Sequence, residues 1–336
     1  MSARDELRRF LFEDSPVRGY VVRLDATWKA TTEHHGYPPV VRGVLGEAMA
    51  ATALLAGTLK FNGRLTLQVQ GEGPLHLLVT QCSDALEMRG VARFRGTVPA
   101  GTLEAITGGG RVTVTVESGD QDTRYQGVVP LLGEGLSAGL EEYFVRSEQL
   151  PTRLWLAADG EGAAGLLLQQ LPTGSSASTE EDPAVRAAAQ DLWERVGALA
   201  ATITPAELLR LPVEELLHRL FHEENVRLFA GSPVSFRCAC SRERTAALLR
   251  ALGRAEVEDI IAQDIAPFRD FSWDPRFTYT VDDAAGTVTV RGPGIAARMA
   301  KFNGDQGCSI LPRGESRIRT ALRPRRPAGP AGRRRT

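Results

Sequence analysis

Two cysteines separated by a single residue, Cys238 and Cys240, are the residues of this sequence best suited to chemistry. Thiolates this close together can bind one metal ion, and they can also be oxidised to a disulfide. A structural zinc site needs four ligands, usually with a second Cys or His pair roughly 15 to 30 residues further along. No second pair follows, so Cys238 and Cys240 alone do not complete a zinc site, and they stay candidates for metal or redox chemistry.

Other side chains of a chemically useful type are better explained by structure. Cys82 ends a predicted core strand, so we expect a buried, unreactive thiol, and Cys308 stands alone. His218 and His222 have the i, i+4 spacing of a shared metal site, but their charged neighbours indicate a solvated helix face. We therefore expect neither cysteine nor the histidine pair to form a site.

The segment Gly160–Gly165 matches the GxGxxG pattern of dinucleotide-binding proteins. Only six residues separate Gly165 from Pro172, which is too short for the helix that binds the phosphates. We predict a hairpin turn there, and a further turn at Gly108–Gly110. No nucleophile with a base and an orienting acid can be identified, so the sequence does not predict an enzyme.

Composition and charge narrow the class of protein. The chain is 43% hydrophobic and 24% charged, which is typical of folded proteins. Its length of 336 residues favours two or three domains. The net charge is −1, but residues 312–336 carry nine arginines and one glutamate, which leaves the rest of the chain at −9. An acidic body disfavours nucleic-acid binding.

The N-terminal residues lack the apolar segment of a secretory signal, and the apolar stretch 43–59 is interrupted by Glu47. We therefore expect a cytoplasmic protein without a membrane span, in which a structural disulfide framework is not expected.

Residues 1–172 are predicted to form an α+β domain built on an antiparallel sheet. Short connections rich in Gly, Asp and Ser separate its strands, which favours hairpins over parallel crossovers. The predicted strands are 18–28, 65–70, 75–80, 86–94, 111–116, 124–131, 152–158 and 164–171, and the predicted helices are 43–59 and 136–147.

Three further segments follow this domain. A polar stretch opens a helical linker, 173–230, with helices predicted at 185–199, 205–211 and 213–220. A small C-terminal module, 231–290, contains Cys238 and Cys240, with helices at 241–252 and 255–262 and weakly β-like residues from 265. Residues 291–336 are rich in Arg, Pro and Gly, and we expect them to be disordered.

Four stretches together resemble the redox-regulated 33 kDa chaperonin family, also called the heat-shock-protein-33 family. They are Leu59–Gly71, Tyr143–Thr152, Leu166–Pro172 and Phe236–Arg244. Their order and spacing also match the family, and the resemblance covers residues 15–264.

This resemblance implies a client-binding domain, a helical linker packed over it, and a zinc-ribbon-like module with four zinc-bound cysteines. It implies that Cys238 and Cys240 are the redox-switch residues and two of the four expected zinc ligands. Oxidation in that family expels zinc and pairs the cysteines. The module and the linker then lose structure, and apolar surface is exposed that holds unfolding client proteins without ATP during oxidative stress. The oxidised protein forms a homodimer.

The sequence departs from the family pattern after Asp264, where a second cysteine pair is expected. If Phe277 and Tyr279 match the family's closing aromatic residues, Asp270 and Trp273 occupy the two cysteine positions. Our hypothesis is a loosely folded module and a holdase that is constitutively or more readily active.

Three alternatives remain open from the sequence. A frameshift near residue 265 would account for the basic tail, and two chains could pool their Cys238 and Cys240 pairs around one zinc. A zinc-ribbon-like nucleic-acid-binding protein, using the same cysteines and the arginine tail, is the alternative class.

Overall fold

The computed structural model describes residues 5–33, 35–118, 123–131, 135–172, 183–238, 251, 278–282, 287–291, 309–311 and 315–319. The chain divides into two compact units, Met1–Cys238 and Ala239–Thr336. The first unit contains the linker helices as well as the N-terminal strands, and the predicted start of the C-terminal module at residue 231 falls inside it.

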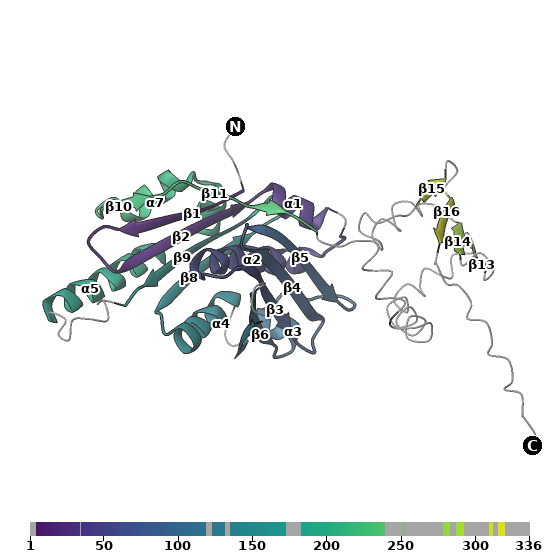
Figure 1. Ribbon diagram of the computed structural model, residues 1–336, viewed down its shortest axis with the longest axis horizontal. Coiled ribbons are helices and arrows are strands. Elements are labelled where there is room, and N and C mark those ends of the chain that lie inside the picture. The colour runs from purple at the N-terminus through teal and green to yellow at the C-terminus, as the bar shows by residue number, and fades with distance from the viewer. Residues whose placement is uncertain are drawn as a thin grey trace, which may run out of the picture. The chain divides into compact units, whose positions relative to one another are not determined.

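Two six-stranded sheets form the framework of the first unit (Figure 1). Sheet A is antiparallel, with the order β10-β1-β2-β9-β8 and with β11 also paired to β1. Its strands are β1 (Glu6–Phe12), β2 (Val17–Leu24), β8 (Thr152–Ala158), β9 (Ala163–Gln170), β10 (Val226–Leu228) and β11 (Ser232–Pro233).

Sheet B has the order β12-β5-β4-β3-β6-β7. Its strands are β3 (Gly63–Gln70), β4 (Leu75–Ser83), β5 (Glu87–Phe94), β6 (Arg111–Ser118), β7 (Thr123–Pro130) and β12 (Ser235–Phe236). The pairs are antiparallel except for the short parallel pair of β12 with β5, which joins segments about 150 residues apart in the chain. The predicted hairpin of residues 65–80 is confirmed as β3–β4.

Helix α2 (Pro39–Thr58) packs against strands of both sheets (Figure 1). Small residues allow this close approach: a Cβ atom built on Gly46 would lie 2.4 Å from the Cβ of Ala158. Within the described residues α2 is also the helix long and apolar enough to cross a membrane, and 67% of its most apolar stretch is buried in the fold. Its place between two sheets accounts for its composition.

The remaining helices of this unit are shorter or lie further along the chain. They are α1 (Ala26–Thr32), α3 (Leu103–Thr107), α4 (Leu136–Tyr143), the π-helical turn η1 (Phe144–Glu148), α5 (Pro183–Ala200), α6 (Pro205–Arg210) and α7 (Val213–Phe221). The three predicted linker helices correspond to α5, α6 and α7. The capping box of Thr204 and Glu207 fixes the start of α6.

One local prediction was wrong, and strand β1 was not predicted. The strand predicted over residues 18–28 ends at Leu24, because the carboxylate of Asp5 accepts N–H bonds from Asp25, Ala26 and Thr27 and so caps helix α1. Strand β1 was missed, since Arg8 and Arg9 obscure its apolar alternation.

In the second unit, the described residues form a four-stranded antiparallel sheet with the order β13-β14-β16-β15. Its strands are β13 (Thr278–Asp282), β14 (Thr287–Arg291), β15 (Ser309–Leu311) and β16 (Glu315–Arg319). The last two lie in the stretch expected to be disordered. The predicted helices 241–252 and 255–262 fall outside the described residues except for Ala251, so the zinc-ribbon-like module stays a prediction.

Candidate functional site: the covered face of sheet A

Sheet A is apolar on both faces, and its outer face is the candidate site. Side chains alternate along each strand, so residues two apart share a face. Strands β1, β2, β8 and β9 turn one set of side chains away from α2, and this set forms a second core cluster with the linker helices. The buried residues of the sheet in this cluster are Phe10, Phe12, Val17, Val21, Ala157, Ala164, Leu166 and Leu168.

Helices α5, α6 and α7 cover this face with their own apolar residues. Helix α7 buries Val213, Leu216, Leu217, Leu220 and Phe221, the spacing of one continuous apolar face. The Phe221 ring lies 5.1 Å from that of Phe12 and 6.1 Å from that of Phe10, measured between centroids. The other linker residues buried in this cluster are Leu192, Trp193, Val196, Ala200 and Leu208.

Ion pairs join the helices to the rim of the sheet. Arg8 of β1 donates to Glu214 in the first turn of α7. At the opposite edge strand, Arg153 of β8 pairs with Glu194 of α5 at 3.0 Å, and its guanidinium lies 5.0 Å from the centroid of the Trp193 ring. These contacts fix the orientation of helices whose main attraction to the sheet is non-directional.

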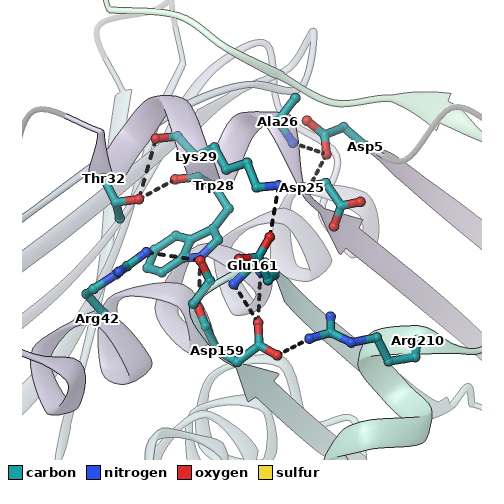
Figure 2. A network of polar contacts seen from close by, with 12 residues as sticks. Asp5, Asp25, Ala26, Trp28, Lys29, Thr32, Arg42, Asp159, Glu161 and Arg210 are labelled. Atoms are coloured by element: carbon teal, nitrogen blue, oxygen red, sulfur yellow. Dashed lines mark hydrogen bonds and ion pairs between the residues drawn. The ribbon is translucent and has the colours of Figure 1, made fainter.

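The turn between β8 and β9 connects α6 to helices α1 and α2 (Figure 2). Its Asp159 carboxylate accepts a hydrogen bond from Arg210 of α6 and the backbone N–H groups of Glu161 and Gly162. The Asp159 carbonyl accepts the Trp28 indole N–H at 3.0 Å. The turn therefore carries contacts to α6 on one side and to α1 on the other.

Two more contacts join the β8–β9 turn to helices α1 and α2. Arg42 of α2 donates to the Gly160 carbonyl at 3.0 Å, and Lys29 of α1 pairs with Glu161 at 3.2 Å (Figure 2). The segment that matched the dinucleotide pattern is thus a hairpin turn that binds protein groups, and the prediction of a turn is confirmed.

After α7, residues 226–237 run along both sheets, and we call this segment the strap. Its β10 and β11 pair with β1, its Val234 N–H donates to the Asp5 carbonyl at 3.0 Å, and its β12 pairs with β5. Arg237 forms an ion pair with Glu87 of β5. Cys238 follows immediately, so the strap joins the predicted redox residues to the end of α7.

The structure places the predicted chemical residues unevenly. Cys238 is exposed at the end of the first unit, whereas Cys240 and Cys308 lie outside the described residues. Among the described residues no group of three or more His, Cys, Asp or Glu side chains could hold a metal. The part of the chain that is described therefore does not complete a zinc site around Cys238, and the metal stays a prediction.

The structure confirms two structural predictions, the buried thiol of Cys82 and the solvated helix face of His218 and His222. Cys82 is fully buried, and burial, with a smaller contribution from Asp84, raises the pKa of its thiol to about 12, so the thiolate is strongly disfavoured. His218 and His222 lie on the exposed face of α7, with ring centroids 6.0 Å apart.

The rim carboxylates are held in their charged form. The hydrogen bond from Arg8 lowers the pKa of Glu214. At Asp159, burial acts to raise the pKa, but the N–H donors of Glu161 and Gly162 and the Arg210 guanidinium outweigh it, so the pKa is lowered. Both carboxylates therefore favour the covered state when ionised.

Comparison with known proteins identifies the family. The family profile described as Hsp33 protein matches residues 5–266. The chain belongs to the Hsp33 family. A 33 kDa chaperonin of Nitrosococcus oceani is 49% identical over 263 residues, 78% of this chain and 86% of that protein. That of Methylobacillus flagellatus is 44% identical over 264 residues, 78% of this chain and 87% of that protein.

A solved structure shows the same fold. The 33 kDa chaperonin of Thermotoga maritima superposes with a TM-score of 0.61 at 21% identity, over 90% of this chain and all of that one. By its family the chain is a chaperone and not an enzyme. These Hsp33 relatives give no support to a nucleic-acid-binding protein.

The residues that cover sheet A were not singled out from the sequence, although one signal was present. The apolar run Ala163–Leu168 in β9 lacks the alternation of a half-exposed strand, which indicates burial on both faces. The rim pairs gave no such signal, because Arg8 and Glu214 are 206 residues apart.

Replacing Phe221 by Ala should weaken the hold of α7 on sheet A. Removing a buried phenylalanine typically costs about 3–5 kcal/mol, and here the loss falls on the contact with Phe10 and Phe12. We expect faster amide hydrogen exchange in α7 and unchanged exchange in α2. His218→Ala, on the exposed face of α7, is the matched control; equal exchange in α7 for both variants would contradict the assignment of this face.

Acid should loosen the linker helices. A carboxylate with a lowered pKa in the folded state stabilises that state above its ordinary pKa, and this contribution is lost as the pH falls through the folded value. The ordinary values are 4.5 for Glu214 and 3.8 for Asp159, so loosening should begin below about pH 4.5 and increase at lower pH.

The emission of buried Trp193, obtained by subtracting the spectrum of a Trp193→Phe variant, reports this change. The double variant Glu214→Gln, Asp159→Asn should show a weaker dependence on pH. Glu142→Gln, which removes an exposed pair with Arg146 on another helix, is the control and should titrate like the unaltered protein. If the double variant kept the pH profile of the unaltered protein, Glu214 and Asp159 would not cause the acid loosening of the linker helices.

Proposed function

We propose that the protein is an ATP-independent, redox-regulated holdase that binds unfolding client proteins on the outer face of sheet A. The observation that carries this proposal is the second core cluster, in which an apolar sheet face is closed by separate helices. A face of this kind, once uncovered, is a large contiguous apolar patch, and such patches bind other apolar protein surfaces.

The polar contacts at the rim add little to the apolar burial that holds the covering in place. Arg8–Glu214 and Arg210–Asp159 lie at the protein surface, with Glu214 64% and Arg210 52% exposed, where a single ion pair contributes about 0–1 kcal/mol. Sheet A keeps its inner core with α2 when the helices leave. Uncovering therefore does not require the sheet itself to unfold.

The strap gives Cys238 and Cys240 a route to these helices. Oxidation of two thiols by peroxide forms a disulfide and two waters, and it changes the backbone geometry directly after β12. β12 pairs with β5 over two residues, through the N–H groups of Ser235 and Arg237, and the Arg237–Glu87 ion pair adds to this short attachment. If the strap detaches, α7 loses the anchor at its C-terminal end.

Zinc is part of the proposal only as an expectation from the family. Cys238 and Cys240 would supply two ligands, and the others would have to come from residues beyond those described or from a second chain. We also propose, from the family alone, that the protein forms a homodimer on activation, is located in the cytoplasm and acts under oxidative stress.

Because the sequence lacks a second cysteine pair, we expect the reduced protein to suppress aggregation of a thermally unfolding enzyme without added peroxide. A structural zinc contributes about 10–16 kcal/mol to a small module, which is comparable to the stability of a whole domain. Light scattering of the client, with zinc measured on the same sample, checks this. Suppression that requires peroxide would contradict constitutive activity, and no suppression in either state would contradict the holdase itself.

The cysteine double variant Cys238→Ser, Cys240→Ser separates regulation from binding. We expect it to suppress aggregation as well as the reduced protein and to lose any further response to peroxide. Cys82→Ala is the control, because a buried thiol of raised pKa should not take part in the response. One zinc per two chains would support shared ligation between subunits.

A further inference from the structure

Arg23 is a charged residue on the covered face of sheet A. It follows Val17 and Val21 along β2 at even spacing, and both of these residues belong to the second core cluster. In the register of the sheet Arg23 lies opposite Glu6 of β1 and opposite Ala164 of β9. The apolar face thus ends in an arginine close to α6 and α7.

Among the residues that the structure describes, two donor atoms of this arginine are buried without a hydrogen-bond partner. They are Nε and Nη2 of the guanidinium. The neighbouring carboxylate of Glu214 accepts from Arg8 instead, and Glu6 lies 3.9 Å from the same Arg8. Arg23 is near these carboxylates without a hydrogen bond from Nε or Nη2 to either.

The electrostatic balance at Arg23 is unfavourable in the covered state. Burial lowers its pKa more than Asp25, Glu6 and Glu214 raise it, and Arg210 of α6 lowers it further. A buried donor without a partner costs the free energy of its lost hydration, and that cost disappears when water returns. Departure of α6 and α7 would hydrate the guanidinium.

We propose that Arg23 is a positioning residue that sets how readily the linker helices leave sheet A, because its buried and unpaired donors favour the uncovered state. The role rests on the proposed function, in which uncovering this face activates the chaperone. The apolar burial of α7 stabilises the covered state of sheet A, and the buried donors of Arg23 destabilise it. The two contributions act on the same helices, so their difference decides the threshold for release.

The same strand contains an arginine with the opposite properties. Arg18 donates from Nε and Nη2 to the side-chain oxygen of Gln169 at 3.0 and 2.6 Å. Its ring neighbour is Tyr20, which belongs to the inner core cluster. Arg18 is therefore satisfied in the covered state, and its replacement should not tighten the linker.

Amide hydrogen exchange of the reduced, full-length protein tests the proposal. In Arg23→Met, which keeps the length of the side chain and removes its charge and donors, we expect exchange in α6 and α7 to slow by tenfold or more, with exchange in α2 unchanged. Arg18→Met should give no slowing in α6 and α7.

A second variant guards against the loss of a partner for Glu6. The double variant Glu6→Gln, Arg23→Met leaves no carboxylate opposite the new methionine, and it too should slow exchange in α6 and α7. Exchange at the unaltered rate or faster in this double variant overturns the proposal, including when the single variant does not fold.

The measurement contains no client protein, so it is independent of holdase activity. If Arg23→Met slows exchange and the unaltered protein fails to suppress aggregation both reduced and oxidised, the role of Arg23 stands and the proposed function fails. If both hold, the reduced Arg23→Met protein should suppress aggregation less than the unaltered one.

Discussion

The structure depends on the burial of sheet A from both sides. Its inner face shares a core with α2 and sheet B, and its outer face shares a separate core with α5, α6 and α7. The two cores are built from side chains on opposite faces of the same sheet, and the proposed function requires the outer core to open while the inner one persists. The proposed function, in which apolar surface is exposed without loss of the protein's own fold, depends on this separation.

Helix α7 is held at both of its ends, by different kinds of contact. Glu214 in its first turn pairs with Arg8, and its last turn places Phe221 against Phe10 and Phe12. Beyond the helix the strap continues through backbone hydrogen bonds to β1 and then to β5. In the proposed function, a change at Cys238 and Cys240 would reach α7 from its C-terminal end, whereas a change in the charge of Glu214 would act at its N-terminal end.

The β8–β9 turn extends this arrangement across the sheet. Asp159 contacts Arg210 of α6 through its carboxylate and Trp28 of α1 through its carbonyl, and α1 is in turn capped by Asp5. Asp5 also accepts the N–H of Val234 in the strap through its backbone carbonyl. A chain of direct contacts thus joins α6 to the strap on a path that does not include α7. Both routes end at the residues directly before Cys238.

Local sequence patterns predicted most of the elements, because hairpins and amphipathic helices are determined by residues close together in the chain. Strands β3 to β9 and helices α2 and α5 to α7 were predicted within a few residues of their observed bounds, and the cover by the linker was implied by the family resemblance. The end of β2 was misplaced because Asp5, 20 residues away, caps α1. Arg210 of α6 and Asp159 of the β8–β9 turn are 51 residues apart, so their pairing arises only in the folded chain. The same is true of Arg23, whose two donors are left without a partner among the described residues when α6 and α7 pack near β2. The cysteine module could be predicted only by resemblance.

The sequence departs from its family pattern where the second cysteine pair is expected, outside the elements that form the covered face of sheet A. The family match ends at residue 266, before Asp270 and Trp273, which occupy the expected positions of the second cysteine pair, while the covered face, the rim pairs and the strap all lie before residue 239. The surface proposed to bind clients and the helices that cover it are therefore built from the matched part of the chain. The departure from the family pattern lies after Cys238 in the sequence. Under the proposed function, a change confined to residues after Cys238 would alter when the linker helices leave sheet A and would leave the client-binding surface unchanged.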